Sequence, residues 1–419
     1  MVFLPSEASK NKVRLAYLVS HPIQYQAPLL RRIAQEPDID LTVFFGSDFS
    51  VRGYQDEGFG VDIKWDVPLL DGYRYEFLPA LHDNGTQTVT TPLNHGILSR
   101  LRGQGGSPPF DVLWVHGYAM VNALHGILAA KSLGIPVLLR GDMWLKDRPR
   151  SGTKLLLKKL FLQGLKKLVD GALPVGTMNA AYWRHYFGDD VPLFMMPYAV
   201  DNDSIQKKSV EARAGRDKLM QELNLVAGRP VILFASKLQR RKHCDDLLEA
   251  YKSVASDCTG PAPYLLIVGD GEERAALEEK AAQSGLEGIR FCGFRNQSEL
   301  PRFFDISTVF VLPARHEPWG LIVNEVMNAG RAVIVSDDVG CQPDLITDGV
   351  EGYVYPVGDV GALIEALKRT LDSPEAAAEM GRRALERINT WSFEEDVHAL
   401  RCALAQVTRK ITADRKSVV

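Results

Sequence analysis

The chain lacks three features that would place it in other classes of protein. It has five cysteines in 419 residues, an odd number without a C-x-x-C pair, so neither a disulfide framework nor a cysteine zinc site is expected. The formal net charge of −3 gives no basic surplus of the kind that coats nucleic acid. No stretch approaches the roughly 18 uncharged apolar residues of a membrane-spanning helix, and no signal-like segment opens the chain. These absences predict a reduced, cytoplasmic protein without a nucleic-acid partner.

The chain has enough apolar residues for two or three domains, because 46% of its 419 residues are hydrophobic and 24% are charged. Short apolar runs alternate with amphipathic segments twice, which predicts an α/β protein with two parallel sheets covered by helices on both faces. The first sheet is expected to use strands at 15–19, 41–45, 112–115, 137–139, 172–175 and 194–196. The second is expected to use strands at 231–235, 265–268, 289–292, 309–312, 332–335 and 352–355.

The most informative segment covers residues 315–330, R-H-E-P-W-G-L-I-V-N-E-V-M-N-A-G. Buried strands are expected on both sides of it, so the segment should form a loop followed by one helix over about 319–329. The first N–H groups of a helix lack intrahelical partners, and together with the helix dipole they favour a phosphate. The pattern therefore predicts an anion site at Gly320, Leu321 and Ile322.

Two carboxylates, Glu317 and Glu325, stand eight residues apart around this turn. Glu325 falls about two turns into the helix, where it can accept hydrogen bonds from both hydroxyls of a ribose. Glu317 lies in the preceding loop, within reach of the hydroxyls or the anomeric region of a transferred sugar. Most glutamates are plain surface charges, but the strand, turn and helix around this pair favour a sugar-nucleotide site.

The spacing from Glu317 to Glu325 resembles the E-x7-E motif of retaining glycosyltransferases of the large GT4 family. Residues 234–242 resemble that family's strand-end G-R-L turn with its following lysine. Residues 266–274 resemble its V-G-D-G-P-E turn, and residues 335–344 resemble the segment after the E-x7-E helix. The resemblance covers most of the chain beyond its first hundred residues.

This resemblance implies the GT-B architecture, in which two Rossmann-like domains face each other across a cleft. The segment P-Y-A-V-D at 197–201 is similar to the family's P-N-G-V-D linker. The expected parts are an acceptor-side domain over 1–198, a donor nucleotide-sugar domain over 199–390, and a terminal helix over 391–419 that crosses back to the first domain.

The resemblance also implies which cations take the leaving diphosphate. Lys237 follows a strand end, where ligands bind in open α/β sheets, and Lys242 is within reach of the same crevice. Two ammonium groups would balance the developing charge, although Arg240 and Arg241 compete for that role. The family usually has arginine where Lys237 stands, so a point charge replaces bidentate contact.

Three further residues acquire roles from the resemblance. His116 ends a D-V-x-x-x-H strand and would position a hydroxyl or the developing oxocarbenium charge, whereas a lone histidine there is otherwise structural. Glu317 would orient the sugar rather than attack it. Arg295 follows a strand whose end resembles the turn that reads the nucleobase.

The acceptor side is less defined. Where the family has a glycine-rich turn after its first strand, Pro22 removes an N–H, and the turn either recognises the acceptor through His21 or Gln24 or simply starts a helix. Arg140 and Asp142 follow a later strand and are either an acceptor clamp or an internal ion pair.

Residues 146–167 carry eight Lys or Arg side chains among Leu and Phe. Two interpretations stay open for this segment. A basic amphipathic helix can lie on an anionic membrane surface, which would place the protein peripherally at the inner membrane face. Alternatively, its apolar residues cover the sheet and its lysines form an ordinary wet face.

Neither a metal nor another cofactor is expected. Asp201-Asn202-Asp203 mimics a metal-binding D-x-D but lies in the linker, and GT-B enzymes generally neutralise the leaving group with cations and helix N–H groups. The turn at 269–274 has arginine where a dinucleotide fingerprint needs its third glycine, so NAD is not expected.

The resemblance implies a retaining hexosyltransferase of polysaccharide or glycan biosynthesis. Its co-substrate would be a nucleoside-diphosphate sugar, UDP before GDP, and its acceptor a glycan or glycolipid. Three alternatives stay open, because fold does not fix chemistry: a sugar-nucleotide epimerase, a phosphorylase that would need pyridoxal phosphate on a lysine, and a non-catalytic module that binds nucleotide.

Overall fold

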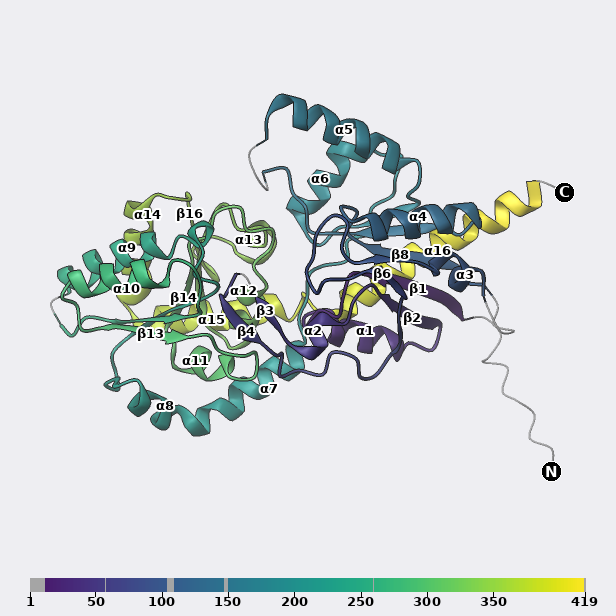
Figure 1. The fold of residues 1–419 in the computed structure, drawn as a ribbon. Helices are drawn as coiled ribbons and strands as arrows, with labels where there is room; N and C mark the ends of the chain where they lie inside the picture. The colour runs from purple at the N-terminus through teal and green to yellow at the C-terminus, as the bar shows by residue number, and fades with distance from the viewer. Residues whose placement is uncertain (1–11, 57, 104–108, 147–149, 259, 418–419) are drawn as a thin grey trace.

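The computed structural model describes residues 12–417 apart from 57, 104–108, 147–149 and 259. Two lobes, each built on a six-stranded parallel sheet, lie side by side (Figure 1). The first sheet contains, in spatial order, β10 (Gly171–Leu173), β9 (Val137–Arg140), β8 (Val112–His116), β1 (Val13–Val19), β2 (Ile39–Phe45) and β5 (Arg74–Phe77). The second contains β13 (Ile289–Gly293), β12 (Tyr264–Val268), β11 (Val231–Ala235), β14 (Val309–Leu312), β15 (Ala332–Ser336) and β16 (Gly352–Tyr355).

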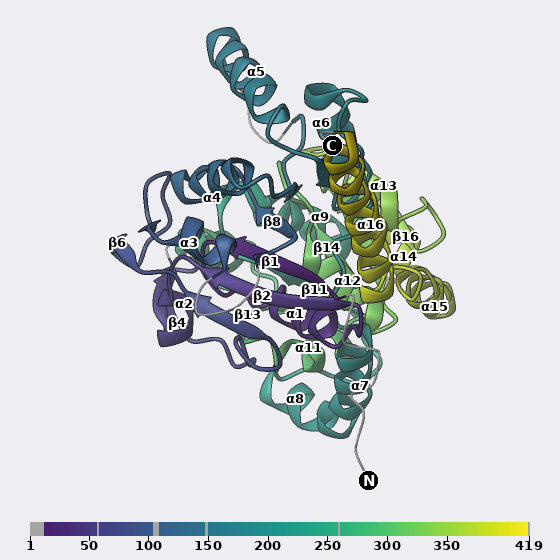
Figure 2. The same cartoon turned by 90° about the vertical axis from the view of Figure 1, so that its right-hand side faces the viewer.

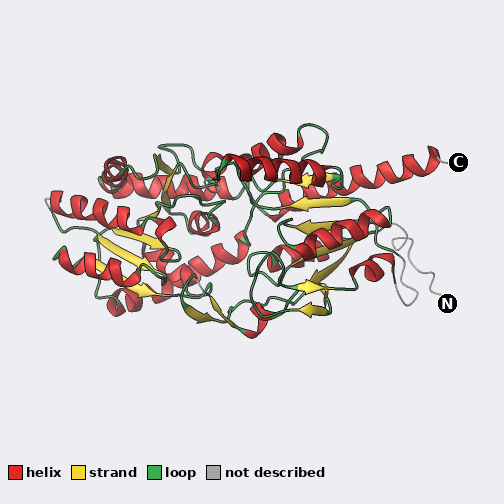
Figure 3. Ribbon diagram, turned by 45° about the horizontal axis from the view of Figure 1, so that its top comes forward, coloured by secondary structure: helices red, strands yellow, loops and turns green. Residues whose placement is uncertain are grey.

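Helices cover both faces of each sheet (Figure 3). Those before the linker are α1 (Ala27–Ala34), α2 (Phe49–Arg52), α3 (Ile97–Arg102), α4 (Val121–Ser132), α5 (Gly152–Lys166) and α6 (Thr177–Phe187). Those after it are α7 (Asn202–Ala212), α8 (Arg216–Glu222), α9 (Cys244–Asp257), α10 (Arg274–Gln283), α11 (Leu300–Ile306), α12 (Leu321–Asn328), α13 (Gln342–Leu345), α14 (Val360–Leu371), α15 (Pro374–Ile388) and α16 (Phe393–Ser417). Two small hairpins complete the first lobe, β3 (Tyr54–Asp56) with β4 (Val61–Ile63) and β6 (Ala80–His82) with β7 (Leu93–Asn94).

The prediction of two parallel, helix-covered sheets is confirmed, with two differences in the first one. The expected strand at 194–196 does not form, and only a single bridge joins Leu193 to Ala172. The segment still runs beside β10, because Phe194 N–H donates to the Ala172 carbonyl at 2.9 Å and Met196 N–H to the Pro174 carbonyl at 2.8 Å. Pro174 has no N–H to return a bond, which interrupts the regular ladder. The extra edge strand β5 was not expected, because its R-Y-E-F sequence is half charged and half exposed.

The end of the chain packs on the first lobe. Helix α16 crosses from the second lobe and lies along the first sheet (Figures 1 and 2). Its apolar side chains join the core beneath that sheet, namely Val397, Ala399, Leu400, Ala403, Leu404 and Val407. The predicted boundaries at 198 and 390 are not tested by this packing and stay predictions.

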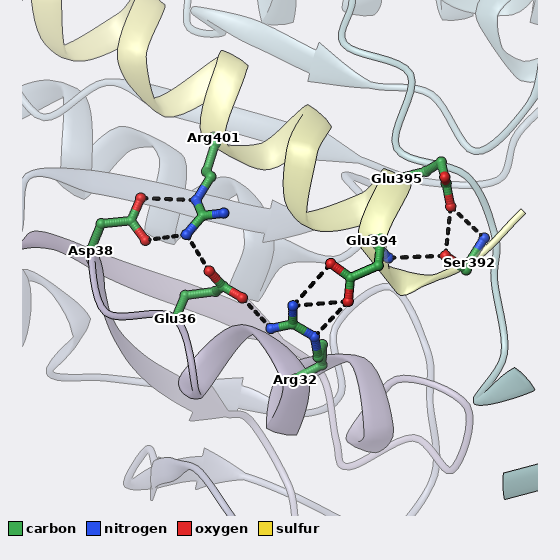
Figure 4. A network of polar contacts seen from close by, with 7 residues as sticks. All are labelled: Arg32, Glu36, Asp38, Ser392, Glu394, Glu395 and Arg401. Atoms are coloured by element: carbon green, nitrogen blue, oxygen red, sulfur yellow. Dashed lines mark hydrogen bonds and ion pairs between the residues drawn. The ribbon is translucent and has the colours of Figure 1, made fainter. Parts of the chain in front are cut away.

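Charged pairs fix α16 to the first lobe (Figure 4). Arg32 of α1 donates to Glu394 at 2.9 Å, and Arg401 of α16 donates to Asp38 at 2.9 Å. Glu36 accepts from both arginines. This network adds specificity to the docking of α16 rather than much stability, because Asp38, Glu394 and Arg401 are exposed to solvent and Arg32 is partly exposed.

The linker between the lobes is held by two tryptophans. The carbonyl of Tyr198 accepts from Trp391 Nε1 at 3.0 Å and from Asn324 Nδ2 at 3.0 Å. Trp391 stacks on Trp319, with 5.7 Å between the ring centroids. The linker therefore contacts α12 directly.

In the described part of the chain, no helix combines the length and the apolar character needed to cross a membrane.

Candidate active site

A cleft of about 360 Å³ lies between the two lobes, at the carboxyl ends of the second sheet's strands. Side chains from both lobes line it. The first lobe contributes Gln24, Tyr25, Tyr54, Asp56, Phe59 and Trp65. The second contributes, among others, Ser236, Lys237, Arg241, Lys242, Phe294, Arg295, Gln297, Glu317, Gly320, Leu321, Ile322 and Glu325. The nine predicted residues among these, Gln24 and eight from the second lobe, therefore come together in one cavity.

The start of α12 faces this cleft through Gly320, Leu321 and Ile322. Gly320 has a φ of 92°, in the left-handed region that favours glycine. A Cβ there would also lie 3.1 Å from both Leu312 and Val339. Glycine thus lets the loop that follows β14 turn into the helix. The N–H groups of the first helical turn have no intrahelical partners, so this end of α12 can accept an anion from the cleft.

Glu317 lies in the loop before this helix and is tied to two cations. Its Oε2 accepts from Arg241 at 3.0 Å and also from Lys242. Burial raises the pKa of Glu317, but the charges of Lys242 and Arg241 outweigh burial and hold its pKa below the ordinary value. Burial lowers the pKa of Lys242, and Glu317 opposes that shift. The two groups therefore form a buried, ionised pair at the mouth of the anion site.

The backbone around Glu317 is fixed by the loop after β15. Glu317 N–H donates to the carbonyl of Asp338 at 3.2 Å, and its carbonyl accepts from Gly340 at 2.9 Å. His316 has a positive φ of 53°, and its N–H donates to the Asp338 carboxylate at 2.9 Å. The strained backbone conformation of His316 is thus stabilised by hydrogen bonds to the loop after β15. The same hydrogen bonds fix the backbone that carries the Glu317 carboxylate.

Glu325 sits deeper along α12, on the same side of the cleft. Its Oε1 accepts from Gln297 Nε2 at 3.3 Å. Burial raises its pKa to about 7. Unlike Glu317, it has no cationic partner within ion-pair distance among the described side chains, so its charge depends on pH near neutrality.

Lys237 is paired across the cleft. Its Nζ lies 2.7 Å from Asp56 Oδ1 and 4.8 Å from the centre of the Phe59 ring. Phe59 in turn packs edge-on against Phe294, with 4.9 Å between centroids. The β3–β4 hairpin of the first lobe therefore reaches across the cleft to the second lobe.

The two predicted histidines lie at adjacent strand ends of the first sheet, behind the cleft lining. His116 contacts Gln26 Nε2 at 3.2 Å, and His21 contacts Ser20 Oγ at 2.9 Å. Burial lowers the pKa of His116 to about 3 and that of His21 to about 4. Both rings are therefore neutral at pH 7 and act as hydrogen-bonding groups rather than as cations.

Comparison with known proteins shows which family the chain belongs to. A GDP-mannose-dependent alpha-mannosyltransferase from Mycobacterium tuberculosis is 32% identical over 298 residues, which are 70% of this chain and 71% of that protein. The family model described as glycosyl transferases group 1 matches residues 215–387. This chain belongs to that family.

Other relatives of this group 1 glycosyl transferase match over shorter stretches or by fold. An alpha-D-kanosaminyltransferase from Streptomyces kanamyceticus is 29% identical over 43% of this chain, and the chain spans only 46% of its length. A solved structure from Anabaena, in complex with UDP and glucose, has a TM-score of 0.64 at 16% identity and covers 97% of this chain and 100% of that one. The predicted GT-B fold is confirmed by this likeness.

Arg140 forms an internal ion pair with Asp396, which favours that interpretation over an acceptor clamp. It is 3% exposed, and its guanidinium contacts Asp396 of α16 at 3.2 Å and the carbonyls of Met196 and Pro197 at 3.1 and 2.8 Å. The Arg140 guanidinium thus connects the linker, through Met196 and Pro197, to Asp396 of α16. Asp142, by contrast, stays an acceptor-side candidate in this group 1 glycosyl transferase, because burial and then the charge of Glu317 raise its pKa.

Several cleft residues had no signal in the sequence. Tyr54, Asp56, Phe59 and Trp65 belong to a short hairpin without apolar periodicity, and Gln297 follows a strand end without a motif. The aromatic density of residues 54–65 was the available hint.

One group of described residues could hold a metal ion, namely His243, Asp245 and Asp246 at the start of α9. His243 and Asp246 already pair at 3.0 Å. Acidic groups of this kind are common without a metal, and the linker residue Asp201 caps α7 by accepting from Ser204 N–H at 3.0 Å. Neither group supplies an argument for a metal in the cleft.

Proposed function

We propose that this protein is a retaining glycosyltransferase that moves a hexose-type sugar from a nucleoside-diphosphate sugar to a glycan or glycolipid. The observation that carries the proposal is the placement of Glu317 and Glu325 on one wall of the cleft between the lobes, with the start of α12 between them. UDP is the first candidate for the nucleotide and GDP the second. The proposal retains the cytoplasmic compartment expected from the sequence.

The donor would be held by residues of the second lobe. The N–H groups at the start of α12 and the ammonium of Lys237 would bind the diphosphate. Glu325 would accept from the ribose hydroxyls, and the backbone near Arg295 would contact the base. Arg295 is well suited to stiffen that turn, because its Nε donates to the carbonyl of Cys292 at 3.1 Å.

Glu317 and Lys242 would act at the bond between the sugar and the diphosphate, which breaks during transfer. Lys242 would stabilise the charge that develops on the departing diphosphate, and Glu317 would orient the sugar by accepting from its hydroxyls. Because Glu317 is already ion-paired, it is a weak nucleophile, which supports front-face attack by the acceptor. The resulting bond would keep the configuration of the donor sugar.

The first lobe would present the acceptor. Gln24 lines the cleft, and Asp142 has a raised pKa that makes it a better proton acceptor. Neutral His116 would position a hydroxyl as a hydrogen-bonding partner. Because lysine and helix N–H groups would neutralise the diphosphate, we expect full activity in the presence of EDTA; collapse of activity and its rescue by manganese would contradict this part.

The test begins with a thermal-shift screen against UDP, GDP, ADP and their common sugar conjugates, because a ligand of the native state raises Tm. The responding donor is then incubated with candidate acceptors, and the anomeric configuration of the product is read by NMR. Transfer with retention supports the proposal. Conversion of the donor without an acceptor would identify an epimerase, and binding without turnover would identify a non-catalytic module.

A further inference from the structure

Helix α5 stands away from the rest of the first lobe. Figures 1 and 2 show it projecting at the edge of the molecule, next to α6, and only its last turns reach the core of the first sheet, through Leu162 and Leu165. Of its residues Gly152–Lys166, only Leu162 and Leu165 are buried. The expectation that its apolar residues cover the sheet is therefore wrong for most of the helix.

The side chains of α5 divide into two faces, since residues three and four apart lie on the same side of a helix. Lys158, Leu162 and Leu165 form the inward face, and the ammonium of Lys158 lies 4.6 Å from the centre of the Tyr182 ring. The outward face carries four large apolar side chains. Their exposed fractions are 58% for Leu156, 66% for Leu157, 61% for Leu160 and 42% for Phe161.

This outward apolar face is unusual for a protein in water. A single exposed leucine needs no explanation, but three leucines and a phenylalanine close together on one helix face form a patch of the kind that marks an interaction site. At one edge of the patch Phe161 packs against Tyr118, with 5.9 Å between the ring centroids. The buried residues of α5, Leu162 and Leu165, lie on the other side of the helix from Leu156 and Leu160.

The surroundings of the apolar face are basic. Lys154, Lys159 and Lys167 are exposed at its margins, and the sequence from Arg148 to Val169 contains no Asp or Glu. Leucine and phenylalanine on one face with lysines at the edges is the composition of helices that lie in the interface of a membrane with anionic lipid. With 15 residues, α5 would be about 22 Å long, too short to cross a bilayer but suited to lie on one.

We propose that α5 docks this protein on a bilayer surface that contains anionic lipid. Leu156, Leu157, Leu160 and Phe161 enter the boundary between headgroups and acyl chains, and the lysines contact lipid phosphates. A second copy of the chain fits this face less well, because pairing two α5 helices would bring their lysines together without acidic partners. The charge pattern therefore favours lipid over self-association.

The experiment is flotation of the full chain with vesicles of phosphatidylcholine alone or with about 30% phosphatidylglycerol, at low and at high salt. We expect binding to the anionic vesicles only, with a clear decrease at about 0.5 M salt, where the Debye length is only a few ångströms. Substituting Leu156→Gln and Leu160→Gln together should reduce the bound fraction about tenfold or more. Both side chains are exposed, so folding should be unaffected.

Matched variants separate this face from general surface effects. Val210→Gln with Val226→Gln removes two apolar side chains of similar exposure from the second lobe and should leave flotation unchanged. Lys154→Gln with Lys159→Gln should weaken binding to anionic vesicles at low salt, whereas Lys207→Gln with Lys218→Gln, two exposed lysines of the second lobe, should not.

Absence of flotation with anionic vesicles at low salt would overturn the proposal, as would equal flotation of the Leu156 and Leu160 variant. Dimerisation that this variant abolishes, without vesicle binding, would assign the face to self-association instead. The test needs neither donor nor acceptor, so it is independent of the transfer reaction. That the acceptor is itself lipid-linked rests on the proposed function and would be tested separately, by comparing transfer to vesicle-bound and free acceptors.

Discussion

Lys237 of the second lobe and Asp56 of the first form an ion pair across the cleft, with 2.7 Å between Nζ and Oδ1. Nearby, Ser298 N–H donates to Asp66 at 3.2 Å, and on another side of the interface Thr177 Oγ1 donates to Asp344 at 2.6 Å. The lobes are thus joined at several points without a ligand. We assign the ammonium of Lys237 to the donor diphosphate, but in this structure it is paired with the Asp56 carboxylate. Donor binding must therefore displace that carboxylate.

Substituting Asp56→Asn should therefore strengthen nucleotide binding. The amide oxygen can still accept from the N–H groups of Gly58 and Phe59, both at 2.9 Å, but its charge no longer competes for Lys237. We expect the Kd for UDP or GDP, whichever binds, to fall severalfold, measured by isothermal titration calorimetry at low salt.

Asp62→Asn is the matched control, because Asp62 is an exposed carboxylate of the same hairpin and has no described contact with Lys237. Its affinity should equal that of the wild type. Weaker binding by the Asp56 variant would show that Asp56 supports the donor site, for instance by holding the hairpin closed, and would contradict competition.

The raised pKa of Glu325 predicts that donor binding depends on pH. Burial raises its pKa to about 7, and a carboxylate that accepts from two ribose hydroxyls must be ionised to do so. Donor affinity should therefore rise roughly tenfold from pH 6 to pH 8, as the ionised fraction grows. UDP-glucose or GDP-mannose is the suitable ligand, because both phosphates are esterified and their charge stays constant over this range.

Glu325→Gln should bind the donor more weakly at pH 8 by about tenfold or more and should lose the pH dependence. Glu365→Gln, an exposed carboxylate on α14, should behave as wild type. A variant at 325 that keeps the wild-type affinity and slope would refute the assignment of Glu325 to the ribose.

The donor wall could be predicted because its signals are local. The run Val309–Leu312 has the length and apolar character of a buried strand, and the turn at Gly320 is followed by a helix that the structure places at Leu321–Asn328, two residues later than expected. In a parallel sheet the strand ends share one edge, so Lys237 and Glu317 could be placed together without knowing any distance.

The pairing partners of these residues could not be predicted. Strands β3 and β4 have three residues each, too few for periodicity, and Asp56 meets Lys237 only because the lobes close on each other. Arg140 shows the same limit. Its ion pair with Asp396 joins positions 256 residues apart, and no local pattern distinguishes it from an acceptor clamp.

Lys242 should be essential for transfer and for stability. Lys242→Met removes the ammonium assigned to the leaving diphosphate, and we expect kcat to fall about 100-fold or more. It also leaves Glu317 buried with Arg241 alone, which should cost about 3 kcal/mol in the free energy of unfolding at pH 7. Lys252→Met, a half-exposed lysine of α9, is the control and should change neither quantity by much.

The stability cost of Lys242→Met should itself depend on pH. The pKa of Glu317 is held below its ordinary value of 4.5, so the stabilisation from the pair is present above that value and is lost as pH falls through the depressed pKa. The difference in Tm between wild type and variant should therefore stay constant from pH 7 to about pH 5 and shrink as the pH falls below 4.5. A difference that stays constant below that value too would mean that lost packing, not charge, explains the destabilisation.

Arg140 should act on stability and not on acceptor binding. Burial raises the pKa of Asp396 to about 8 even beside Arg140, so in Arg140→Leu this carboxyl takes up a proton at pH 7. The variant then loses the donor to Asp396 and to the carbonyls of Met196 and Pro197, and we expect a loss of about 3 kcal/mol in chemical denaturation. The double variant with Asp396→Leu should recover part of that loss, because no buried, unpaired carboxyl remains. KM for the acceptor should stay near the wild-type value in the folded double variant. A large rise in acceptor KM with little loss of stability would instead restore Arg140 to the acceptor site.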